Sequence, residues 1–320
     1  MKKILFYLAM AGLAACSSDQ DDSAGAVVNE PLLYASSYYV AETRASDGLY
    51  APSVGFDGTE KVTVWMKGSG AATQAEYRVG APTAGRSKLT PAAAALVYPA
   101  SGTATVYAVY PSTSTSVHVV ARDQSNTKTH APGDAGYKAS DLMYARVTVA
   151  ESAQQTEQSL AFDHQMVKLR VVLTKAAGVS QVNSVTLNNI LRRVSVTPSE
   201  TGITVGSAVA AQSGDKDYSD DADVNNSILV GGEEAASDAE QTYSYTCVLP
   251  AQGWSGGDFL TVVADGESHT YTTTQTLEKG KSYTVSLTVD PGALGTAPLW
   301  GGPLGTRGDA DDYSRNDINN

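Results

Sequence analysis

The sequence predicts an all-β protein built from two β-sandwich domains. Three observations support this fold class. Thr, Val and Tyr alternate with polar residues in many short runs, Gly and Pro interrupt the chain about every ten residues, and helical periodicity is almost absent. A chain of 320 residues is long enough to bury the cores of two such domains.

The first 15 residues are expected to be a bacterial export signal. The basic start "MKK" precedes an apolar run, residues 4–15, which is too short to cross a bilayer as a helix of ~20 residues. The run ends in "LAAC", which resembles a lipoprotein cleavage site. We therefore expect Cys16 to be lipidated and to anchor the chain in the outer membrane; an ordinary secretory signal with an incidental cysteine is the alternative. Residues 17–22 then read as an acidic tether.

A strand-forming leader, residues 31–40 ("PLLYASSYYV"), lies within the segment 16–44, which comprises the acidic tether and this removable strand. Alternation along it predicts one face that docks in the first domain, formed by Leu32, Tyr34, Tyr38 and Val40. A strand of this kind is exchangeable in principle, because another strand can supply the same ladder of hydrogen bonds.

Two groups of predicted strands follow, in residues 45–157 and 158–290, with a polar link between them. The apolar pattern of "LAFDHQMVKLRVVL" changes phase near Met166, which indicates a β-bulge. Asp265-Gly266 separates two strand-like runs and predicts a tight hairpin. Residues 291–320 are rich in Gly, Pro and Asp and predict a tail with a poor strand pattern.

Net charge and cysteine content limit which partners the chain can bind and which disulfides it can form. The formal net charge is -12, and losing Lys2 and Lys3 with the signal gives -12 - 2 = -14, which argues against nucleic acid as a partner. Without Cys16, only Cys247 is left, so no disulfide can form within the chain and this thiol is expected to pack as a small hydrophobe.

Patterns that carry catalysis or bind metals are sparse, so we expect no enzymatic activity, no metal and no cofactor. The four histidines show no metal-ligand spacing, and neither GxSxG nor a phosphate-binding loop occurs. His164 has two interpretations, a general base or a hydrogen-bonded core histidine. The second is favoured because its run holds no nucleophile or paired carboxylate.

Two further motifs are weak. Residues 215–226 ("DKDYSDDADVNN") place oxygen-bearing side chains at alternating positions, as a calcium loop does. However, Asp220 stands where a glycine is needed and Asn226 where a bidentate Glu should be, so a solvated acidic loop is the preferred interpretation. Residues 307–309 spell the integrin tripeptide RGD, which three residues of a polar tail produce by coincidence.

Several segments, taken in order, are similar to those of the fimbrillins, the subunits of type V pili. They are "TRAS", "FDGTEKVTVWM", "LVYPASGTATVYAVYP", "SDLMYARVTV", "LAFDHQMVKLRVVL", "CVLPAQGW" and "LEKGKSYTVSLTV". The resemblance implies two tandem transthyretin-like β-sandwich domains, lipoprotein export and assembly with other pilin subunits into a fimbria at the cell surface. It also implies that an arginine-specific protease cuts after Arg44 and leaves Ala45 as the new N-terminus.

The resemblance and the physical pattern together predict donor-strand exchange, in which a strand of another subunit replaces the leader. Because the tail is a poor donor strand, the chain is interpreted as a tip or accessory subunit, or else the strand near Tyr283 rearranges. The alternative function is a surface-tethered glycan-binding lipoprotein, which would need an exposed aromatic platform from Trp65, Trp254 or Trp300.

Overall fold

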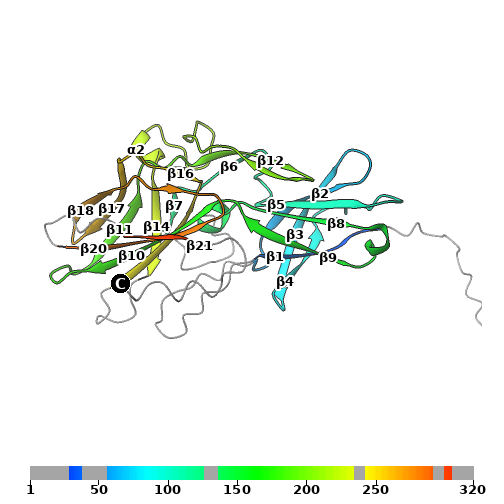
Figure 1. The fold of residues 1–320 in the computed structure, drawn as a ribbon, viewed down its shortest axis with the longest axis horizontal. Helices are drawn as coiled ribbons and strands as arrows, with labels where there is room; N and C mark the ends of the chain where they lie inside the picture. The colour runs from blue at the N-terminus through cyan, green and yellow to red at the C-terminus, as the bar shows by residue number, and fades with distance from the viewer. Residues whose placement is uncertain (1–28, 38–55, 126–135, 234–241, 291–298, 305–320) are drawn as a thin grey trace, which may run out of the picture.

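The computed structural model describes residues 29–37, 56–125, 136–233, 242–290 and 299–304, and their regular structure is almost entirely β-strand (Figure 1). The helices in these ranges are single turns: α1 (Tyr137–Ser140), the 3-10 turn η2 (Glu151–Ala153) and α2 (Ala222–Asn225). The all-β prediction is confirmed. Predicted positions outside the described residues are Cys16, Tyr38, Val40, Arg44, Ala45 and residues 307–309.

The first sheet closes on itself as a barrel. Its strands, in order around the barrel, are β1 (Leu32–Ser37), β4 (Arg86–Pro91), β3 (Thr73–Thr83), β2 (Lys61–Lys67), β5 (Ala104–Tyr110), β8 (Met143–Val149) and β9 (Glu157–His164). The sequence predicted a two-sheet sandwich here. In the structure β1 pairs with both β4 and β9 and so joins what would be two free edges.

Alternating apolar side chains fill the barrel. Strand β9 shows this clearly, since Leu160 and Phe162 are fully buried while Ser159 is exposed. Val62, Val64 and Val106 of the central strands β2 and β5 belong to the same core, whereas Val109, on the opposite face of β5, packs in a second core. The barrel core also includes Leu33 and Ala35 of β1.

The second large sheet contains strands from the later part of the chain. Their order is β18 (Glu267–Thr272), β17 (Asp258–Ala264), β11 (Val182–Leu187), β14 (Ile228–Glu233), β15 (Thr242–Leu249), β10 (Val167–Lys175), β20 (Ser282–Val289) and β21 (Leu299–Leu304), with β7 (Asp123–Gln124) paired beside β14. Two small sheets accompany it: β13 (Gly202–Val205), β12 (Arg193–Ser199) and β6 (Val117–Val119), and β16 (Gln252–Gly253) with β19 (Thr276–Leu277).

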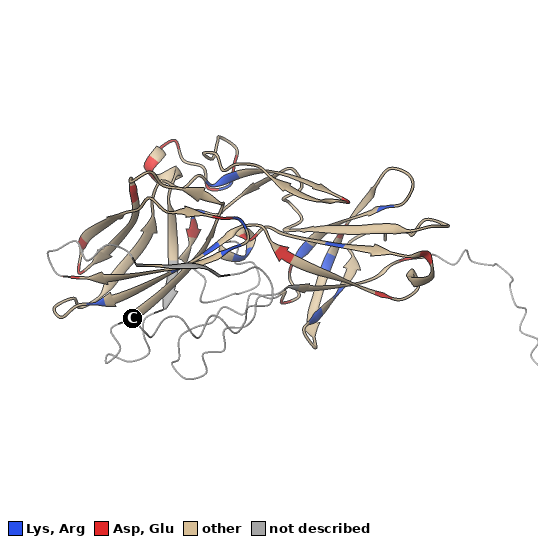
Figure 2. Ribbon diagram, viewed as in Figure 1, with Lys and Arg blue, Asp and Glu red and all other residues tan. Residues whose placement is uncertain are grey.

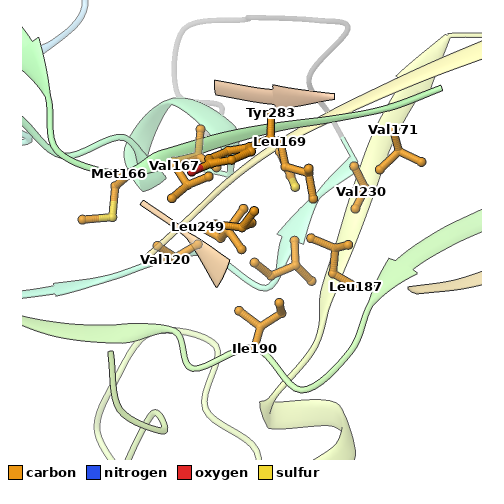
Figure 3. Packing of buried hydrophobic residues seen from close by; sticks show 14 of the residues in the cluster. Val120, Met166, Val167, Leu169, Val171, Leu187, Ile190, Val230, Leu249 and Tyr283 are labelled. Carbon is orange, nitrogen blue, oxygen red and sulfur yellow. The ribbon is translucent and has the colours of Figure 1, made fainter. Parts of the chain in front are cut away.

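A second apolar core lies inside these strands. Figure 3 shows side chains from β10, β11, β14, β15 and β20 turned toward one another, among them Leu169, Leu187 and Leu249. The predicted alternation holds in β20, where Val285 and Val289 are completely buried. Cys247 is buried in the same core, as expected, and its burial raises the pKa of the thiol.

The division between the two cores differs from the predicted boundary at residues 157/158. Strand β9 begins at Glu157 and belongs to the barrel, and β10 begins the second sheet at Val167. The phase change near Met166 is therefore a crossing from one core to the other, not a bulge within one strand. In addition, β6 and β7 come from the first half of the chain but pair with strands of the second half.

The predicted hairpin at Asp265-Gly266 is present. Strands β17 and β18 flank it in antiparallel register, and both turn residues have positive φ, +50° and +83°. Two consecutive positive φ values are the signature of the tight turns that match the twist of a hairpin, and Asp-Gly tolerates them well.

A hairpin from the second half reaches the barrel. The Tyr144 hydroxyl of β8 donates to the carbonyl of Ser199 at 2.7 Å, and Arg146 donates to the carbonyl of Thr201 at 3.2 Å. Both acceptors lie where β12 turns into β13, and Figure 1 shows β12 running toward the barrel. These bonds connect the two cores beyond the covalent link.

The tail contains a strand, contrary to the poor pattern read from its sequence. Residues Leu299–Leu304 form β21, which pairs antiparallel with β20. The ring of Trp300 lies 5.2 Å from that of Phe259, so contact with the second core supplies what the Gly- and Pro-rich sequence lacks.

Candidate functional site

The leader strand β1 is part of the barrel. It pairs in parallel with β9 from Leu32↔Glu157 to Ser37↔Phe162, and antiparallel with β4 at Tyr34↔Lys88 and Ala35↔Ser87. Figure 1 shows β1 between these two strands. If β1 left, β4 and β9 would both present unpaired backbone groups to a groove lined by apolar side chains.

The covalent connection of β1 to the barrel is indirect. Its two strand partners lie far along the chain, and the next strand among the described residues, β2, begins at Lys61. A single cut between Ser37 and Lys61 would therefore leave β1 held by non-covalent contacts alone. Arg44 lies in this interval of the sequence.

The buried face of β1 is the opposite of the predicted one. Leu33 is 0% exposed and Ala35 is 1% exposed, whereas Leu32 is 43% exposed and Tyr34 is half-buried on the outside. The prediction that Leu32 and Tyr34 enter the core is wrong. Apolar residues occupy both parities of "LLYA", so this stretch did not fix the face, and the apolar pair farther on at 38 and 40 suggested the wrong one.

The start of β1 is tied to the barrel end by Asn29. Its backbone carbonyl accepts from the N–H of Tyr98 at 2.9 Å, and its side-chain amide donates to Gln154 at 3.0 Å. The side chain of Gln155 donates to the same Asn29 amide oxygen. These bonds fix the strand's entry and thereby its register.

The outer face of β1 carries a cluster that sequence reasoning missed. The Arg86 guanidinium of β4 lies 4.3 Å from the centre of the Tyr34 ring and 2.9 Å from the carboxylate of Glu157 on β9. The Tyr34 hydroxyl donates to Glu157, which raises the pKa of Tyr34; the hydrogen bond from Arg86, followed by the one from Tyr34, lowers the pKa of Glu157. One residue from each of three adjacent strands thus meets over the groove.

The chain is attached to the barrel a second time, independently of β1, at residues 56–60. The Phe56 ring packs edge-on against Tyr110 at 5.6 Å and against Phe162 at 5.2 Å. The carboxylate of Glu60 accepts from the backbone N–H of Asp57, and Lys138 binds both acids, at 3.0 Å and 2.6 Å. Losing the leader would therefore leave the next segment attached.

Lys138 also sets the ionisation of Asp57. Partial burial of this carboxyl group opposes its charged form, but the hydrogen bond and charge of Lys138, with a bond from Thr59, lower the pKa of Asp57 to about 2. The pair is thus fully charged at neutral pH, which keeps the anchor intact.

The other candidate residues have structural roles. His164, at the end of β9, bonds through Nδ1 to Asp141 Oδ2 at 2.7 Å, which fits the preferred reading of a hydrogen-bonded histidine. In the acidic loop near α2, where Figure 2 shows several acidic residues, Asp215 accepts from Arg193 and Asp221 caps the helix. The described residues contain no group of three or more His, Cys, Asp or Glu that could hold a metal ion.

The aromatic platform required by the glycan-binding alternative is not formed by two of its candidates. Trp65 is buried and stacks on Tyr107 at 5.3 Å, and Trp254 is buried against Phe259. Trp300 is partly buried beside the same phenylalanine. No observation on the described residues therefore favours that alternative.

No helix within the described ranges has the length and apolarity needed to cross a membrane.

Comparisons with known proteins point to one group. A protein family described as fimbrillin-like matches residues 43–299 of the chain. A comparison with curated protein sequences finds no match.

Solved structures similar to the chain include two with a TM-score above 0.5. One is described as a candidate cell adhesion protein from Bacteroides uniformis; it shares 15% sequence identity with a TM-score of 0.55, over 85% of this chain and 97% of that one. The other, described likewise and from Bacteroides ovatus, shares 17% identity with a TM-score of 0.56, over 87% of this chain and 96% of that one. At these identities the likeness supports the fold.

Proposed function

This chain belongs to the fimbrillin-like family, and we propose that it is a fimbrial subunit assembled by donor-strand exchange after a cut at Arg44. The family membership makes it a non-enzymatic structural protein of the cell surface that interacts with other pilin subunits. The further steps are the proposal: lipidation at Cys16 anchors the precursor in the outer membrane, and an arginine-specific protease frees Ala45 as the new N-terminus.

The observation that carries the proposal is the position of β1. It completes a barrel through two ladders, yet its attachment to that barrel passes through the segment holding Arg44. Cutting there converts an internal strand into a separate peptide. The exposed edges of β4 and β9 then accept an equivalent strand from another subunit, since backbone hydrogen bonds do not depend on which chain supplies them.

Head-to-tail contacts of this type extend as filaments when the rotation between successive subunits does not close a ring. Within this scheme we assign the chain a tip or accessory position. Its only strand in the described part of the tail, β21, is six residues long with two glycines and a proline, and it is already paired with β20.

The test uses the full-length precursor and an arginine-specific protease. The expected result is an early cut that leaves Ala45 as the N-terminal residue, followed by SDS-resistant oligomers when the cut protein is mixed with a fimbrial subunit that donates a strand. The matched control, Arg44→Gln, should stay monomeric under the same treatment. If the leader is released but no oligomer forms with any of the strand-donating fimbrial subunits tested, the proposal is overturned.

A further inference from the structure

The groove that β1 occupies has two sides, and they are built differently. On the inside, Leu33 lies opposite Gln158 and Ala35 opposite Leu160, so a large apolar residue and a small one alternate. Any strand that fills the barrel core needs this spacing. The outside is open to solvent, and there the chain places charged residues on both walls.

The outer walls converge on one position. Register places Glu157 opposite Leu32 on one side, while Arg86, next to Ser87, lies one residue beyond the Ala35 pairing on the other. The two side chains nevertheless meet at 2.9 Å, so their ion pair crosses β1 diagonally. The ring of Tyr34 lies at the crossing, against the guanidinium.

We propose that Arg86 and Glu157 are specificity-determining residues that select an incoming strand with an aromatic side chain at the position of Tyr34. This rests on the proposed strand exchange. The face of an aromatic ring attracts the guanidinium, and a phenolic hydroxyl also satisfies the carboxylate. A small aliphatic side chain at that position offers neither contact, so Arg86 and Glu157 keep only each other and water. The preferred strand therefore has a large apolar residue, an aromatic residue and a small residue at three consecutive positions, as Leu33-Tyr34-Ala35 does.

The tail of this chain contains the same order of residue types in Leu299-Trp300-Gly301. A peptide with this sequence is thus a natural second probe. It carries a ring for Arg86 and lacks the hydroxyl for Glu157, so the selection rule ranks it below the leader and above a strand without an aromatic residue.

The experiment measures peptide binding to the cleaved protein after the leader has been removed in mild denaturant and the denaturant diluted. A fluorescent peptide of residues 29–37 is competed by unlabelled versions carrying Tyr34→Phe or Tyr34→Ala. We expect the Ala peptide to bind about three- to tenfold more weakly. Both contacts are exposed to solvent, so together they are expected to contribute little more than one exposed cation–π contact. The Phe peptide should fall between the two.

Protein variants test whether Arg86 causes the difference in affinity between the Tyr and Ala peptides. Arg86→Gln should reduce the ratio between the Tyr and Ala peptides to the part that the hydrogen bond to Glu157 supplies. Arg78→Gln, on β3 and not adjacent to β1, should leave the ratio unchanged. Equal binding of the Tyr and Ala peptides would overturn the selection rule while leaving strand exchange intact. Failure of every peptide to rebind the emptied barrel would contradict both the rule and the proposed function.

Discussion

Replacing Leu33 with Ala tests most sharply how β1 is held. Leu33 is 0% exposed in the barrel core, and its neighbour Leu32 has the same chemistry but is 43% exposed. Truncating a fully buried leucine typically costs ~2–5 kcal/mol, whereas exposed positions usually change stability by less than about 0.5 kcal/mol. Leu32→Ala is therefore a control matched in residue type and in sequence position.

The assay follows release of the leader after cleavage at Arg44, using a fluorophore on the leader segment. If the loss of binding energy appears in the dissociation rate, Leu33→Ala should speed release by at least about thirtyfold, because every 1.4 kcal/mol corresponds to a factor of ten. Leu32→Ala should change it by less than about threefold. A larger effect from Leu32→Ala would refute the assignment of the buried face.

Three further predictions concern the rest of the molecule. Arg192→Met should lower the free energy of unfolding by ~3–5 kcal/mol in chemical denaturation, because the buried guanidinium donates to several backbone carbonyls that would be left unpaired. The barrel should lose stability as the pH falls from about 4 to about 2, because the pKa of Asp57 is lowered in the folded state, and Lys138→Met should flatten this dependence. Tyr144→Phe should cost ~0.5–1.5 kcal/mol and speed amide exchange around Ser199 by removing one hydrogen bond.

Two of these predictions have a contrasting control variant, and the third has an outcome that would contradict it. Arg193→Met removes a partly exposed ion pair with Asp215 and should cost less than Arg192→Met; equal losses would contradict the role of the buried guanidinium. Lys61→Met removes an exposed pair with Glu76, so an equal flattening of the acid profile would argue against Asp57 as its source. Unchanged exchange near residue 199 would show that the hairpin does not depend on Tyr144.

Local sequence signals predicted much of the fold, because they depend on near neighbours. Alternation identified β20, and Asp265-Gly266 identified a turn whose two positive φ values few other pairs tolerate. The phase change near Met166 was also visible, but a bulge and a crossing between two cores produce the same pattern. Only the long-range pairing of β9 with β1 distinguishes them.

The site was harder to predict than the strands. The leader's existence followed from its strand-forming residues, but its buried face depended on a register with β4 and β9 that no local pattern contains. The contact among Tyr34, Arg86 and Glu157 is of the same kind, since it joins residues from three separate strands. Sequence supplied Tyr34 as a candidate, and only the topology brings Arg86 and Glu157 to it.

Amide hydrogen exchange along β9, at residues 157–162, tests the central claim most directly. The claim is that β1 completes the barrel and can be replaced. The alternate amides of this stretch whose N–H groups point toward β1 should be protected in the precursor, become exposed once the cleaved leader has left, and regain protection when a strand from another subunit binds. Protection that stays unchanged after the leader is gone would show that the barrel does not need β1, and would contradict the account.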